Sequence, residues 1–210
     1  MRDQRVAKAQ PSPVLPAHCT VVIGLPCTRP GFEHSVRTSD NAYARQYPGG
    51  WDQYCVQWLT PMNQFARAAQ SLGVKLVPEA SAATLKASFH RPDLAVLVLL
   101  SHWSAHAVEM AGGFASVADL VDMVPDRFDG VLDLCICHPD GLAAALVREK
   151  PACLVRFKPR KVSPLWWLPY FEGLFRMLAS GKFTYVQAYE LINLELAERM
   201  TKNGLRKLTA

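Results

Sequence analysis

A histidine and a cysteine follow two of the most apolar segments of the sequence, and together they have the chemistry of a nucleophile and its base. His102 comes shortly after the run 95–100, and Cys137 directly follows the run 130–136. An imidazole beside a thiol keeps the sulfur as a thiolate and can later protonate a leaving amine. The two residues therefore predict a Cys–His dyad if the fold brings these segments together.

The same region also carries donors for a metal ion. Nitrogen and sulfur ligands of the kind found in tetrahedral zinc sites are supplied by His102, His106, Cys135, Cys137 and His138. Against this, a Cys-x-Cys pair within a strand lacks the tight turn of a CxxC pair, and the sequence has no second cysteine pair. Zinc binding is therefore an alternative to the dyad, and the dyad itself needs no cofactor.

Three common catalytic or nucleotide-binding patterns are missing from the sequence. The segment 24–31 follows a predicted strand but has neither the GxGxxG nor the GxxxxGK[ST] spacing that cradles phosphates. No GxSxG motif is present either, which removes the usual signal of an α/β-hydrolase. Dinucleotide and P-loop nucleotide binding are therefore not expected.

The elements that would position His102 and Cys137 alternate along the chain. Strands are predicted from short apolar runs at 20–24, 74–78, 95–100, 130–136 and 152–157. Helices are predicted at 51–72, kinked or split into two pieces at Pro61, at 82–89, from 116, at 140–149, at 164–178 and at 184–200. Runs that are apolar throughout are typical of parallel strands covered on both faces. The pattern predicts an α/β fold: a three-layer α/β/α sandwich with a mainly parallel sheet and a flavodoxin-like core.

In an open parallel sheet, ligands and chemistry collect beyond the carboxyl ends of the strands. With the strand order 2-1-3-4, the third and fourth strands are neighbours, so His102 and Cys137 are expected to lie about one strand spacing apart. The segment Pro26–Gly50 is rich in Pro, Gly, Ser, Arg and Asn and is predicted to be a long loop. Because it leaves the first strand at the same edge, we expect it to border this site and to govern access to it.

Composition sets the limits of the molecule. The chain has 210 residues, 50% of them hydrophobic and 20% charged, with a formal net charge of +5, which excludes a disordered protein and fits a single domain. Residues 1–17, with three prolines, are predicted to form a flexible arm, and residues 18–210 to form the domain. No apolar segment of secretory or membrane-spanning length is present, so we expect a cytoplasmic protein with reduced cysteines, no membrane contact and no nucleic-acid partner.

Read together, these motifs resemble the caspase-like (clan CD) cysteine peptidases, most closely their bacterial CHAT branch. That family has a His after one strand and a Cys at the end of the next, and the segments "LLSHW" and "VLDLCIC" match this layout. Its C-terminal pattern is similar to Tyr170-Phe171, to 178–181 and to 185–189 here. The resemblance covers roughly residues 74–200. It departs at Trp103, where the family usually has Gly.

The resemblance implies a caspase-like fold and a cysteine endopeptidase that cleaves a protein or peptide substrate. His102 would be the general acid and base and Cys137 the nucleophile, while backbone N–H groups at Trp103 and Cys137 would hold the oxyanion. It also implies a role in bacterial defence. The alternative is an inactive caspase-fold module that recruits or regulates a protein partner, with the zinc-binding protein as a third reading.

Overall fold

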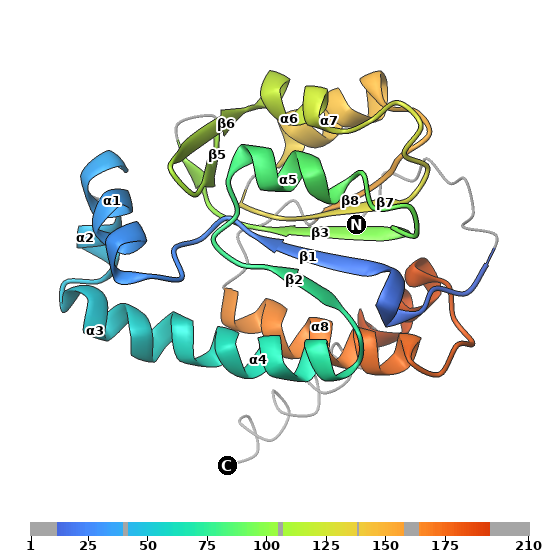
Figure 1. Cartoon of the computed structure of the whole chain (residues 1–210), viewed down its shortest axis with the longest axis horizontal. Coiled ribbons are helices and arrows are strands. Elements are labelled where there is room, and N and C mark those ends of the chain that lie inside the picture. The colour runs from blue at the N-terminus through green and yellow to red at the C-terminus, as the bar shows by residue number, and fades with distance from the viewer. Residues whose placement is uncertain (1–11, 40–41, 105–106, 138, 158–163, 194–210) are drawn as a thin grey trace, which may run out of the picture.

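A five-stranded parallel sheet forms the middle layer of the computed structural model, which describes residues 12–39, 42–104, 107–137, 139–157 and 164–193 (Figure 1). Its strands, in spatial order, are β2 (Lys75–Val77), β1 (Cys19–Ile23), β3 (Val96–Leu100), β7 (Val131–Cys135) and β8 (Leu154–Phe157). Every neighbouring pair is parallel. The predicted α/β sandwich, its five strands and the 2-1-3-4 order of the first four are confirmed.

Helices cover both faces of the sheet. The upper layer in Figure 1 consists of α5 (Ala82–Ser88), α6 (Val117–Met123) and α7 (Asp140–Glu149). The lower layer contains α3 (Gly50–Tyr54), the π-helical segment η2 (Cys55–Leu59), α4 (Thr60–Ser71) and α8 (Pro164–Leu178). Alternate residues of β3 enter the two cores: Leu97 and Leu99 pack upward, and Val96, Val98 and Leu100 pack downward. Successive side chains of a strand point to opposite faces of the sheet, and both faces are covered here, so every position of β3 is apolar.

The long lower helix is not split at Pro61, because the chain is helical without interruption from Gly50 to Ser71. Proline has no N–H to donate, so one backbone hydrogen bond of a regular helix is missing there. Here the chain widens just before it, and the Thr60 N–H donates to Cys55 C=O across a π-helical turn. The helix ends at Gly73, whose positive φ of 92° closes the last turn as predicted.

Two segments differ from the prediction. Pro26–Gly50 is not a structureless loop, because it contains α1 (Arg29–Thr38) and α2 (Ala42–Gln46). Thr28 caps α1 by accepting a hydrogen bond from Gly31 N–H, and Pro30 fits its first turn. The second difference is a small antiparallel sheet that was not predicted, formed by β4 (Trp103–Ser104), β5 (Ala107–Met110) and β6 (Gly113–Ser116). Strands this short carry too few residues for a clear alternation of apolar and polar positions.

The N-terminal segment is partly packed against the domain. The 3-10 turn η1 (Pro16–His18) leads into β1. Before it, Val14 is buried and its N–H donates to Phe183 C=O at 3.0 Å. The described part of the expected arm, residues 12–17, therefore lies on the domain, whereas residues 1–11 lie outside the described part of the chain.

The C-terminal segment completes the lower layer. Residues 185–193 are helical and begin at the predicted capping box, in which Thr184 and Gln187 exchange side-chain-to-backbone hydrogen bonds of 3.0 and 3.2 Å. The remainder of the predicted helix, to residue 200, lies outside the described residues. Within the described ranges, no helix is long and apolar enough to cross a membrane.

A buried ion pair joins the sheet to this C-terminal segment. Asp133 on β7 is fully buried and forms an ion pair with the guanidinium of Arg156 on β8. Tyr185 Oη donates to the same Asp133 oxygen at 2.6 Å. The Arg156 guanidinium also lies 3.6 Å from the centroid of the Tyr189 ring. Burial disfavours the charge of Arg156, but Asp133 and the surrounding tyrosines together outweigh this effect and keep the Arg156 pKa above its usual value.

Replacing one partner of this pair should destabilise the fold strongly. Arg156→Met leaves the Asp133 carboxylate buried without its cation, which costs about 3–5 kcal/mol in the free energy of unfolding. Tyr185→Phe removes a single hydrogen bond to a charged group and should cost about 1.5–3 kcal/mol. Urea unfolding of the purified variants measures both. A loss for Arg156→Met that is smaller than the loss for Tyr185→Phe would contradict the dominance of the ion pair.

Candidate functional site

His102 and Cys137 follow two neighbouring strands at equivalent positions. β3 and β7 pair in parallel with Leu100 opposite Cys135, so His102 and Cys137 each come two residues after this last pair. Beyond this pair, Ser101 N–H still donates to Cys135 C=O at 3.4 Å. This hydrogen bond keeps the two segments side by side as they leave the sheet. Adjacent strands lie about 4.8 Å apart. The predicted juxtaposition of these two segments at the edge where the parallel strands end, which we call the carboxyl edge, is therefore present in the fold.

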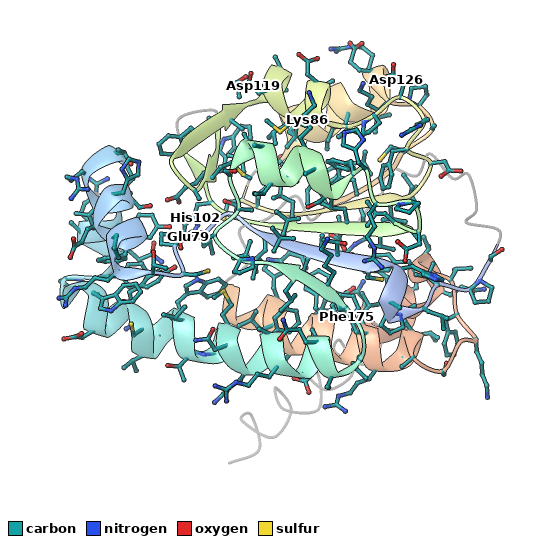
Figure 2. All side chains as sticks on the ribbon, viewed as in Figure 1. Glu79, Lys86, His102, Asp119, Asp126 and Phe175 are labelled. Atoms are coloured by element: carbon teal, nitrogen blue, oxygen red, sulfur yellow. The ribbon has the colours of Figure 1, made fainter. Side chains whose placement is uncertain are left out.

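His102 lies at the carboxyl edge, on the side of the molecule where α1 and α2 stand (Figure 2). Its imidazole is half-buried and meets the ring of Tyr43, on α2, in an edge arrangement with centroids 5.7 Å apart. The segment that connects β1 to α3 thus does border His102, as predicted, although it does so with helices.

A buried carboxylate, that of Glu109, accepts a hydrogen bond from Tyr43, the residue that contacts His102. Glu109 on β5 is 4% exposed, and it accepts hydrogen bonds from Ser35 Oγ at 2.5 Å and from Tyr43 Oη at 2.9 Å. Its neighbours Val108 and Met110 belong to the upper core, so the alternation of the strand turns Glu109 toward α1 and α2. Burial raises the Glu109 pKa, while the two hydroxyl donors and the charge of His34 oppose the increase.

The backbone of Glu109 is bound to the exit of β3. Its N–H donates to His102 C=O at 2.9 Å, and its C=O accepts from Ser101 Oγ at 2.5 Å. This close packing requires a glycine at position 24, at the exit of β1. A Cβ on Gly24 would come within 2.4 Å of Glu109 O and 2.7 Å of Ser101 Oγ. Any side chain at position 24 would therefore displace the residues that flank His102.

Trp103 occupies the position next to His102 in the first strand of the small sheet. Its side chain is half-buried and packs against the upper hydrophobic core, while its backbone pairs with Val108 of β5. The bulk of the indole is thus partly taken up by packing with the upper layer.

The six cysteines differ in environment. Cys19, Cys135 and Cys153 are buried, and the Cys135 thiol donates to Asp133 Oδ1 at 3.6 Å. Burial raises the pKa of Cys27 to about 11 and that of Cys153 to about 12, and it also raises the pKa of Cys19. Cys137 is half-buried at the end of the β7 segment. Of the two cysteines of the Cys-x-Cys pair, Cys137 is therefore the one with solvent access.

Among the described residues, the predicted zinc ligands do not form a metal site. Within the part of the chain that is described, no group of three or more His, Cys, Asp or Glu side chains could hold a metal ion. His106 and His138 of the predicted set lie outside the described residues, and the Cys135 thiol donates a hydrogen bond to Asp133.

The sequence alone does not predict the cluster of Glu109, Ser35 and Tyr43. Glu109 could have been noticed as the single charged residue in the apolar stretch 107–111, since an isolated carboxylate in such a stretch needs a buried partner. Ser35 and Tyr43 lie 74 and 66 positions away in sequence, and only the folded chain joins them to it.

Comparisons with protein-family models and with curated proteins find no relative of this chain. The assignment of a function therefore depends on the residues and their arrangement.

Alkylation should distinguish the cysteines. With iodoacetamide at neutral pH under native conditions, we expect Cys137 to be modified first, because it is half-buried at a strand exit while three of the others are buried. Cys27 and Cys55 are also half-buried, but burial raises the pKa of both thiols, which lowers the fraction of each that is present as thiolate. Peptide mass spectrometry at short reaction times measures the order. Earlier modification of Cys27 or Cys55 would contradict the expectation.

The buried Glu109 should make stability depend on pH. Because its pKa is raised in the folded state, the unfolded chain binds fewer protons between the ordinary pKa of 4.5 and the raised value, and folding becomes more favourable as pH falls through that window. Glu109→Gln removes the ionisable group. The difference in unfolding free energy between wild type and Glu109→Gln should therefore shift in favour of wild type as pH falls toward 4.5, as measured by urea unfolding at several pH values. A difference that does not change with pH would show that Glu109 does not titrate abnormally.

Proposed function

We propose that this protein is a cysteine peptidase of the caspase-like type, in which Cys137 and His102 form the catalytic pair. The observation that carries the proposal is the register of β3 and β7, which brings the exits of the two strands side by side with His102 and Cys137 at equal distance from the last paired residues. A parallel sheet binds its ligands beyond this edge. The short sheet β4–β6 follows His102 directly and supports its backbone.

The proposed reaction begins with transfer of the Cys137 proton to the His102 imidazole. The thiolate attacks the carbonyl carbon of the scissile peptide, and the C–N bond then breaks as His102 returns the proton to the leaving amine. A water molecule, deprotonated by His102, attacks the resulting thioester and releases the carboxylate product and the free thiol.

The negative oxygen of the two tetrahedral intermediates needs donors that are fixed beforehand. Backbone N–H groups at Trp103 and Cys137 are the proposed donors, because both belong to the strand exits that flank the site. Trp103 stands where caspase-like enzymes usually have Gly. Its partial packing into the upper core supports a role in which the backbone serves the reaction and the indole serves the fold.

The proposal is tested with an electrophilic peptide probe, such as a set of acyloxymethyl ketones that differ in the residue next to the electrophile. We expect the probe to label Cys137, Cys137→Ser to abolish labelling, and His102→Ala to reduce it at least about a hundredfold, the typical contribution of a general base. The labelled peptide is identified by mass spectrometry.

Two controls separate loss of chemistry from loss of fold. Cys55→Ser removes a half-buried thiol on the lower helix and should leave labelling of Cys137 unchanged. His102→Ala should retain a cooperative thermal transition, because the side chain is half-buried at the sheet edge. A folded wild-type protein that reacts with none of the probes would contradict a peptidase and favour an interaction module with the same fold.

A further inference from the structure

We propose that Tyr43, held in place by Glu109, is a positioning residue for His102. The inference deepens the proposed peptidase function and rests on it. It assigns to α2, far from His102 in the sequence, the task of limiting which orientations the imidazole adopts.

The Tyr43 side chain is fixed at both ends. At its tip, Tyr43 Oη donates to Glu109 Oε2 at 2.9 Å, and the other carboxylate oxygen accepts from Ser35. Around its ring, Tyr43 meets Phe32, Tyr47 and Tyr54 at centroid distances of 5.7, 6.0 and 6.0 Å. A buried aromatic ring with these contacts has little freedom to rotate, so it is a fixed surface for the side chains that it contacts.

The same carboxylate residue also fixes the backbone of His102. Glu109 N–H donates to His102 C=O at 2.9 Å, and Tyr43 meets the imidazole at an interplanar angle of 75°. One residue therefore anchors the main chain of His102 directly and its ring through Tyr43. Burial and the charge of Glu109 both raise the Tyr43 pKa, so its hydroxyl stays protonated and continues to donate.

A positioning role predicts an effect on His102 beyond any effect on stability. Tyr43→Leu removes the aromatic ring that contacts His102. We therefore expect alkylation of Cys137 at neutral pH to slow by roughly tenfold to a hundredfold, the range for misplacement of a reacting group. We also expect the NMR titration of the His102 imidazole to shift. Tyr43→Phe keeps the ring and loses the hydroxyl anchor, so both changes should be smaller and in the same direction.

Ser35→Ala is the matched control. It removes the second hydroxyl donor to the same carboxylate but leaves the ring against His102, so it should lower the melting temperature while leaving the alkylation rate and the His102 titration unchanged. Equal effects of Ser35→Ala and Tyr43→Phe on all three measurements would overturn the proposal and make the cluster structural only. If Tyr43→Leu does not fold, this comparison alone decides.

The two proposals fail in different ways. If His102→Ala leaves the alkylation rate of Cys137 unchanged, the catalytic pair is wrong. The His102 titration in the Tyr43 variants still reports whether Tyr43 positions the imidazole, because it does not depend on the reaction. An unchanged titration in both Tyr43 variants would refute the positioning role by itself.

Discussion

Asp133 lies in the middle of β7 with no solvent exposure, and its charge joins the C-terminal segment of the chain to the sheet. Removing a carboxylate from water costs several kcal/mol unless a cation and further donors replace the hydration. Arg156 supplies the cation, Tyr185 supplies a hydroxyl donor, and the ring of Tyr189 covers the guanidinium. These partners come from β8 and from the last described helix, so the requirement of one charge fixes how the C-terminal segment lies against the sheet. Cys135, which donates to the same carboxylate, is bound into this network two residues before Cys137.

A second buried carboxylate, Glu109, organises the carboxyl edge in a different way. It has two neutral hydroxyl donors where Asp133 has a cation, and burial raises the pKa of Glu109. Hydrogen bonds from neutral donors offset only part of the free-energy cost of burying a carboxylate. Asp133 therefore belongs to the support of the sheet, while Glu109 joins elements that meet only at the edge: α1, α2 and the small sheet that follows His102.

The sequence predicted what depends on local periodicity. The five apolar runs, the capping boxes at Ser116 and Thr184 and the glycine end of α4 all follow from neighbouring residues, and each is found in the structure. The positions of His102 and Cys137 at adjacent strand exits followed from strand order. The α1–α2 segment has the Pro, Gly and polar content that predicts a loop, but it forms two short helices that long-range contacts stabilise. The partners of Glu109 could not be predicted, since no local pattern links β5 to residues 66 and 74 positions earlier.

Unlike the partners of Glu109, which precede it in the sequence, the partners of Asp133 follow it, Arg156 by 23 positions and Tyr185 by 52. During synthesis at about 5–20 residues per second, β7 is therefore exposed for roughly 3–10 seconds before Tyr185 is made. Throughout that interval, closing the lower layer over β7 would bury a carboxylate without its full set of partners. The N-terminal strands can pair as they emerge, but the lower layer can close over β7 with all the partners of Asp133 in place only after Tyr185 has been made. A nascent chain stalled between β8 and Tyr185 would consequently keep its lower face open to chaperones.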